Sequence, residues 1–164
     1  AALMCVLCPV SVPVGPVPIS LSILVILLTV CVLGPWRALV SYTVYLLLGA
    51  VGMPVFSGFQ GGLAKLAGPT GGYLIGFFVM ILVGGLIMEL SHRNLIATVA
   101  GMVAGIALDY ALGTAWFVFQ TGSTVAHALD VCVYPFIPFD LVKVVIAVAL
   151  GSVLRKALQK AKLL

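Results

Sequence analysis

The chain has 164 residues, of which 63% are hydrophobic and 7% are charged, and its mean hydropathy is +1.33. A soluble domain carries about 25% charged residues, so this composition excludes a water-facing globular protein and indicates an integral membrane protein. Ten-residue stretches of alternating hydrophobicity are absent, and we therefore predict an all-α bundle. The net charge of +4 comes mostly from short loops and the C-terminus, which argues against nucleic-acid binding and reports orientation in the bilayer.

We predict six membrane-spanning helices in a single domain covering residues 1–164. The first helix ends near residue 8, and we expect its beginning to be missing from this sequence. The other helices are expected at residues 20–33, 36–51, 72–90, 95–117 and 140–158. Proline and glycine separate these apolar runs, as at Gly34-Pro35 and between Pro135 and Pro138.

Two connecting segments differ from ordinary loops. Residues 9–20 contain prolines at positions 9, 13, 16 and 18, which exclude a helix and favour an extended path. Because its valines make this segment apolar, it is either a cap over a pocket or a buried connector, and both readings remain open. Residues 120–133 are polar enough to lie outside the hydrocarbon, and a short surface helix is expected there.

The cationic side chains predict the orientation of the bundle. Six of them fall on one side of the predicted helices, at positions 37, 93, 155, 156, 160 and 162, whereas Lys65 is in a loop on the other side. Positively charged loops face the cytoplasm, so both termini are expected to be cytoplasmic in a plasma membrane of bacterial type. The proline segment, the glycine-rich segment and residues 118–139 then share the outer face, and any pocket should open outward.

The segment from Gly49 to Gly76 is the most unusual part of the sequence. Its glycines allow backbone angles and close approaches that other residues cannot make, and Pro54 and Pro69 interrupt any helix through it. Non-helical backbone at membrane depth is tolerated where it is buried in protein or lines a cavity. We therefore interpret this segment as part of a pocket wall.

Charged residues within the predicted spans are rare, and such residues usually mark functional sites. Asp140 and Lys143 lie three residues apart at the start of the last helix, so they share one face. The pair is either a structural salt bridge or a donor and acceptor for a polar ligand, and we favour the ligand role. Asp109 shares a face with small residues of its helix, and for it a site role and a buried hydrogen-bonding role are equally open.

Other chemistry finds little support in the sequence. Cys5 and Cys8 form a CxxC pair, but it lies in an apolar run without a basic group to stabilise a thiolate. Glu89 and His92 form an ExxH pair of the kind used in di-iron sites, but the second copy is absent, so no metal site is expected. We instead predict an ion pair between Glu89 and Arg93. The sequence contains no phosphate-binding loop or nucleophile elbow.

Three blocks resemble a known family: GPVPIS (15–20), PVFSGFQGGLAKLAGPTGGYLIGF (54–77) and YPFIPFDLVKVV (134–145). Together they are similar to the BioY family, the biotin-specific S-components of energy-coupling factor (ECF) transporters. The resemblance implies a six-helix, non-enzymatic membrane subunit without a cofactor that captures biotin from outside. It also implies an EcfT-like transmembrane scaffold and two ABC-type ATPase subunits as partners, which drive release inward.

The resemblance also implies which residues contact the ligand. Asp140 and Lys143 match the family's Asp-x-x-Lys, and residues 60–73 match its glycine-rich, biotin-facing loop. The predicted substrate-binding residues are Asp140, Lys143, Gln60, Gly61, Gly62, Tyr73, Thr70, Phe56 and Asp109.

The chemistry of biotin suggests a role for each part of this set. Asp140 would accept from the ureido N–H groups, and Lys143 or Lys65 would pair with the valerate carboxylate. The apolar rings would contact Phe56 and Tyr73. Two alternatives are an S-component for another small vitamin and an intramembrane enzyme built on Asp109, Glu89 and His92.

Overall fold

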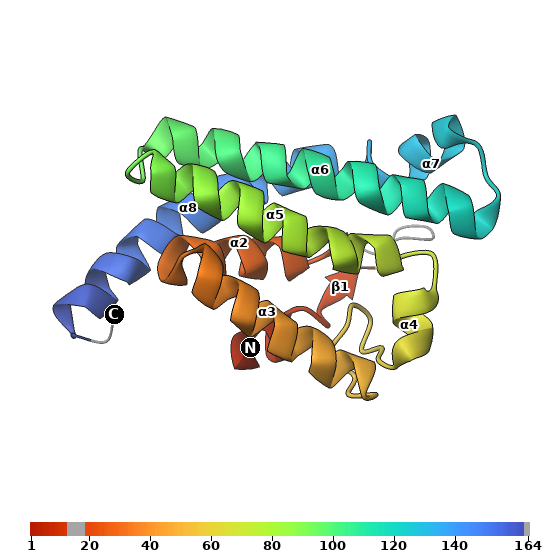
Figure 1. Ribbon diagram of the computed structural model, residues 1–164, viewed down its shortest axis with the longest axis horizontal. Helices are drawn as coiled ribbons and strands as arrows, with labels where there is room; N and C mark the ends of the chain where they lie inside the picture. Colours follow the sequence, from red (N-terminus) through yellow and green to blue (C-terminus); the bar gives the residue numbers. More distant parts are fainter. Residues whose placement is uncertain (13–18, 163–164) are drawn as a thin grey trace.

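The computed structural model describes residues 1–12 and 19–162, and its described part is mostly helical (Figure 1). The helices are α1 (Ala2–Leu7), α2 (Ser22–Leu33), α3 (Pro35–Ala50), α4 (Leu63–Ala67), α5 (Gly71–Leu90), α6 (Leu95–Thr121), α7 (Val125–Cys132) and α8 (Ile137–Lys160). Three of them, α5, α6 and α8, are long and apolar enough to cross a membrane, and α2 is a shorter apolar helix. The described chain is therefore a helical membrane protein with at least three clear spans.

Two short strands flank the proline-rich segment. β1 (Ser11–Val12) and β2 (Ile19–Ser20) pair antiparallel, with Ser11 opposite Ser20. The prediction of an all-α protein therefore misses one two-residue strand pair. The predicted extended path through Pro13, Pro16 and Pro18, and most of the GPVPIS block, lie outside the described residues, whereas the residues on either side of them are extended as predicted.

Most helix boundaries differ from the predictions by one or two residues, as where α2 begins at Ser22 instead of Ser20, and three differences are larger. The short helix α4 was not predicted, because its five residues fit between the two prolines that mark the glycine-rich segment as non-helical. Helix α6 continues four residues beyond the predicted end at Phe117, because its polar end is satisfied by neighbours: Gln120 donates to the carbonyl of Ala67. Helix α8 begins at Ile137 instead of Asp140, because Pro138 is tolerated in a first turn, where no N–H is needed. The short helix expected within residues 120–133 is α7.

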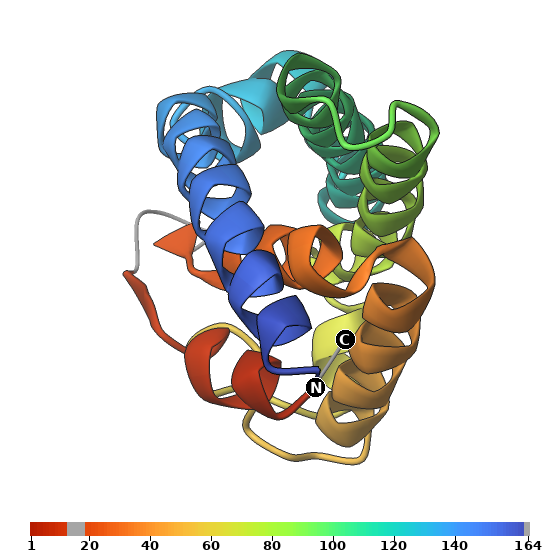
Figure 2. The same ribbon diagram turned by 90° about the vertical axis from the view of Figure 1, so that its left-hand side faces the viewer.

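Helices α5 and α6 form an antiparallel pair side by side and make the most extensive helix contact (Figure 1). Gly113 of α6 makes this approach possible, because a Cβ atom there would overlap the ring of Tyr73 on α5. Small residues at such positions let membrane helices pack closely. Helix α8 packs mainly on α2, and Figure 2 shows the two lying against each other.

Two buried tyrosines of α3 tie the bundle to the segments that surround the site. The hydroxyl of Tyr42 donates to the carbonyl of Leu74 on α5 at 2.6 Å, and that of Tyr45 donates to the carbonyl of Val55 in the glycine-rich segment at 3.0 Å. Both side chains are almost completely buried. The bond from Tyr42 joins α3 to α5, and the bond from Tyr45 holds irregular backbone of the glycine-rich segment in place.

The turn between α5 and α6 corrects one prediction. The expected ion pair between Glu89 and Arg93 is not formed in the described part of the chain. Among the described residues, the ion pair is that between Lys143 and Asp140. Arg93 instead donates to the carbonyl of Cys31 at 2.8 Å, at the C-terminal end of α2. Carbonyls at a helix C-terminus lack partners within the helix, so a guanidinium finds an acceptor there.

Candidate functional site

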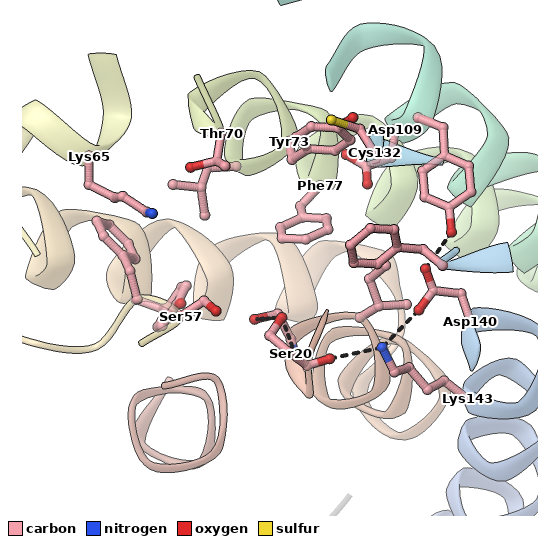
Figure 3. Close-up of a pocket in the computed structure, with 17 residues that line it drawn as sticks. Ser20, Ser57, Lys65, Thr70, Tyr73, Phe77, Asp109, Cys132, Asp140 and Lys143 are labelled. Carbon is pink, nitrogen blue, oxygen red and sulfur yellow. Dashed lines mark hydrogen bonds and ion pairs between the residues drawn. The ribbon is translucent and has the colours of Figure 1, made fainter. Parts of the chain in front are cut away.

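A cavity lies between the first turns of α2, α5 and α8, the middle of α6 and the glycine-rich segment (Figure 3). The empty space between its side chains is about 720 Å³, including the part open to solvent, and about 90 Å³ of it admits the centre of a water molecule. Aromatic side chains form much of the wall, among them Tyr45, Phe56, Phe77 and Phe136. Polar groups are few and stand at defined places, which is the usual composition of a small-molecule site.

One end of the cavity is built around the first turn of α8. The Nζ of Lys143 lies 2.8 Å from Oδ1 of Asp140 and 2.8 Å from the carbonyl oxygen of Ser20, and both charged side chains are buried. Tyr110 of α6 donates its hydroxyl to Oδ2 of Asp140. Both oxygens of Asp140 therefore have protein donors, and the positive end of α8 favours its negative charge.

Asp109 has a different environment, although it is one residue before Tyr110. It lines the same cavity and is 1% exposed, but neither of its carboxyl oxygens has a hydrogen-bond partner among the described residues. Buried polar groups are normally hydrogen-bonded, because leaving them unpaired costs free energy. On the α6 side of the cavity, Asp109 is therefore a buried carboxyl group that accepts no hydrogen bond from the described residues.

The other end of the cavity is formed by Lys65 of α4, Thr70 and Ser57 (Figure 3). Lys65 points into the space and has no ion-pair partner within the described residues, and burial lowers the pKa of its ammonium. Thr70 occupies the N-cap position of α5, but its side chain makes no capping hydrogen bond. Ser57 has a buried hydroxyl without a partner in the described part of the chain. This end therefore offers donors and a positive charge.

The structure brings together most of the predicted site residues. Those that line the cavity are Phe56, Thr70, Tyr73, Asp109, Asp140 and Lys143. Gln60 and Gly61 instead line a shallower recess that shares Lys65 and Thr70 with the cavity, and Gly62 lines neither. The reason is local: the backbones of Phe56 and Gln60 pair with each other, which places Phe56 inside and leaves Gln60 exposed. Ligand contact by Gln60, Gly61 and Gly62 remains a prediction.

Several cavity residues were not singled out from the sequence. The most consequential are Tyr110, which binds Asp140, and Ser20, whose carbonyl binds Lys143. A signal for Tyr110 existed, because a buried tyrosine in an apolar helix needs a partner for its hydroxyl. Phe136 lies within the block YPFIPFDLVKVV, but nothing there separates a wall residue from a packing residue.

The residues of the suggested intramembrane enzyme do not converge. Asp109 packs against Gly76, whereas Glu89 is 13 residues further along α5, which corresponds to about 20 Å. Within the described residues, no cluster of three or more histidine, cysteine or acidic side chains could hold a metal ion.

Apolar spans around a mostly apolar cavity with polar ends define a membrane protein that binds a small molecule. The BioY family model matches residues 1–160, and the chain belongs to the BioY family, as its three sequence blocks predict. It is a multi-pass membrane protein of the cell membrane.

Individual relatives agree with this assignment. The biotin transporter BioY of Thermotoga maritima is 40% identical over 147 residues, which cover 90% of this chain and 86% of that protein. The biotin transporter BioY2 of Lactococcus lactis is 35% identical over 159 residues, which cover 96% of this chain and 87% of that protein. The crystal structure of the S-component for biotin from an ECF-type ABC transporter superposes with a TM-score of 0.87 at 29% identity, covering 94% of this chain and 86% of that chain.

Proposed function

We propose that this chain is the biotin-binding S-component of an ECF-type vitamin uptake transporter and not an enzyme. The observation that carries the proposal is the cavity, whose two polar ends are separated by aromatic walls (Figure 3). Relatives that align over most of the chain are biotin transporters, and the similar crystal structure is that of an S-component for biotin. The substrate is bound and moved without covalent change, and no cofactor is needed.

The shape of biotin matches the distribution of these groups. Its ureido ring carries two N–H donors and a carbonyl, its fused rings are apolar, and its valerate chain ends in a carboxylate. The ureido ring would lie at the end formed by Asp140, Lys143 and Tyr110, where donors and acceptors are already oriented. The fused rings would contact Phe56 and Tyr73.

The carboxylate would lie at the opposite end, near Lys65. Lys143 is already bound by Asp140 and by the Ser20 carbonyl, whereas Lys65 has no ion-pair partner within the described residues. The N-terminus of α5 begins beside Thr70, and its positive end also favours an anion. Of the two lysines considered from the sequence, Lys65 is therefore the better partner for the carboxylate. Gln60, Gly61 and Gly62 would contribute at the mouth of the site.

The bundle would place this cavity toward the exterior. Arg93 and Arg155 both donate to carbonyls at the C-terminal end of α2, whereas the cavity lies at the N-terminal ends of α2, α5 and α8. Cationic residues face the cytoplasm, so the cavity end would face outward. We propose six spans, both termini in the cytoplasm, and residues 1–164 as one transmembrane substrate-binding domain.

Delivery of biotin to the inside would depend on the partners of an ECF transporter. These would be an EcfT-like transmembrane scaffold and two ABC-type ATPase subunits, since the chain itself carries no nucleotide-binding motif. Capture at the outer face would then be separate from the energy-requiring step.

Calorimetric titration of the purified, detergent-solubilised chain tests the substrate. Biotin is expected to bind with one-to-one stoichiometry, dethiobiotin to bind through the same ureido ring and carboxylate, and thiamine to give no binding. Binding of thiamine without binding of biotin would instead identify an S-component for another vitamin. Absence of binding to all three, in protein that is monodisperse, would reject substrate capture.

A further inference from the structure

We propose that Asp109 is a specificity-determining residue that accepts a hydrogen bond from an N–H group of the ligand's ureido ring. This inference rests on the proposed function, since it names how the biotin site selects its ligand. It assigns the main free acceptor to α6, whereas sequence reasoning assigned that role to Asp140 on α8.

The first argument is that Asp109 lacks a protein donor. It is 1% exposed, and both of its carboxyl oxygens are buried without a hydrogen-bond partner among the described residues. Ionisable groups inside a membrane usually mark ligand or ion sites, because their burial is costly. In either protonation state a carboxyl group keeps an oxygen that can accept an N–H.

The second argument is that the neighbouring hydroxyl groups are engaged elsewhere. The hydroxyl of Tyr110 donates to Asp140, and that of Tyr42 donates to the carbonyl of Leu74. The hydroxyl of Tyr73 lies 3.4 Å from that of Thr114, within hydrogen-bonding distance. None of these hydroxyl groups donates to Asp109, and a ligand in the cavity would supply the missing donor.

The third argument is that α5 packs closely against one side of Asp109 and offers it no donor there. Helix α5 approaches it at Gly76, where a Cβ atom would overlap its Oδ1. The backbone of α5 thus closes one side of the carboxyl group, and Figure 3 shows Asp109 beside Tyr73 on the cavity wall. The absence of a side chain at Gly76 leaves room for the carboxyl group at this close approach.

Comparison with Asp140 shows why the two acids differ in role. Oδ1 of Asp140 accepts from Lys143 and Oδ2 accepts from Tyr110, so its strongest acceptor directions are occupied before a ligand arrives. At Asp109 neither oxygen has a donor among the described residues, although Oδ1 packs against α5 at Gly76. An incoming N–H group gains more at Asp109, because it satisfies a buried group that is otherwise unpaired.

The test compares Asp109→Leu with the matched control Thr98→Val, on purified protein in detergent. Thr98 is also buried on α6 with an unpartnered hydroxyl in the described part of the chain, but it lies about 16 Å from Asp109 along the helix and outside the cavity. Without ligand, both variants are expected to unfold at the same temperature as the parent chain or at a higher one, because each removes an unsatisfied polar group.

Binding is expected to separate the two variants. Asp109→Leu should weaken biotin binding at least tenfold and reduce the rise in unfolding temperature that biotin causes. Thr98→Val should change the affinity by less than twofold and leave this rise in temperature unchanged. Asp109→Asn, which keeps one acceptor oxygen, should recover most of the loss. Biotin methylated at the ureido nitrogen that faces Asp109 should bind the parent chain and Asp109→Leu with equal affinity, and the isomer methylated at the other nitrogen should still distinguish them.

Two results would overturn the inference while leaving biotin capture intact. One is binding of biotin by folded Asp109→Leu within twofold of the parent chain. The other is a lower unfolding temperature of ligand-free Asp109→Leu with an equal loss of affinity for biotin and both methylated isomers, which would indicate a structural role. Failure of the parent chain to bind biotin would reject the proposed function itself, and this inference with it.

Discussion

Lys143 and Asp140 form a buried pair in which the ammonium nitrogen lies 2.8 Å from Oδ1 of the carboxylate. The same nitrogen lies 2.8 Å from the carbonyl oxygen of Ser20, so the pair joins the first turn of α8 to the end of β2. Each charge is neutralised by the other inside the bundle. The cavity end at α8 is therefore oriented before any ligand binds.

Breaking this pair should affect both stability and binding. Asp140→Asn and Lys143→Ala each leave a buried polar group without its partner, and such changes typically cost about 3–5 kcal/mol. Each single variant is expected to unfold at a lower temperature and to bind biotin more weakly. Thermal unfolding in detergent and biotin titration measure the two effects.

The double variant Asp140→Asn/Lys143→Ala provides the comparison for the single ones. Because it carries no unpaired charge, its loss of unfolding free energy should be smaller than the sum of the losses in the two single variants. Additive losses would show that the two side chains act independently, in disagreement with the observed geometry.

Tyr110→Phe should weaken biotin binding without changing the aromatic lining of the cavity. The substitution keeps the aromatic ring but deletes the hydrogen bond from the hydroxyl to Asp140. Hydrogen bonds to charged groups contribute about 1.5–3 kcal/mol. Because this bond orients Asp140 toward the proposed ureido site, biotin binding should fall roughly tenfold. Tyr134→Phe is the matched control, because Tyr134 is 57% exposed. Equal affinity in both variants would contradict this role of Tyr110.

Lys65 should determine recognition of the carboxylate. Lys65→Ala is expected to weaken biotin binding roughly tenfold and to leave the weaker binding of biotinamide, which has no carboxylate, unchanged. Lys160→Ala is the control, because Lys160 lies at the end of α8 that is far from the cavity. It should change the affinity for neither biotin nor biotinamide. Equal losses for biotin and biotinamide would show that Lys65 does not contact the carboxylate.

The same residue predicts a pH dependence. Burial lowers the pKa of Lys65, and only its protonated form attracts a carboxylate. Affinity should be full below this pKa and fall as the pH rises through it, starting at a lower pH than for an exposed lysine, whose pKa is about 10.4. In Lys65→Ala this decline should disappear. Titrations of biotin between neutral and alkaline pH measure the effect.

Gly113→Ala should disturb the contact between α5 and α6. The added Cβ would overlap the ring of Tyr73, and such overpacking typically costs about 1–3 kcal/mol. Because Tyr73 also lines the cavity, biotin affinity should fall together with the unfolding temperature. Gly84→Ala is the milder comparison, since its Cβ would meet the flexible end of Met102 at 3.1 Å. A larger loss at Gly84 would contradict this account of the helix contact.

The family and the broad architecture were readable from the sequence because they depend on local features. Runs of apolar residues and their helix breakers predict α5, α6 and α8 to within a few residues. The placement of Asp140 and Lys143 on one helical face also follows from their spacing alone, and the structure finds them paired. Boundaries were less accurate where a proline is tolerated in a first turn, as at Pro138.

What the sequence determined by itself is that this chain is a helical membrane protein of the BioY family, with a glycine-rich wall and an acid–base pair at the last helix. Only the tertiary structure decided which polar groups are already bound. Lys143 bonds to Ser20 across 123 positions and Tyr110 bonds to Asp140 across 30, whereas Asp109, next to Tyr110, has no partner among the described residues. The physical reason is that hydropathy and helix breaking act over neighbouring residues, while hydrogen-bond satisfaction in the cavity depends on how distant helices pack.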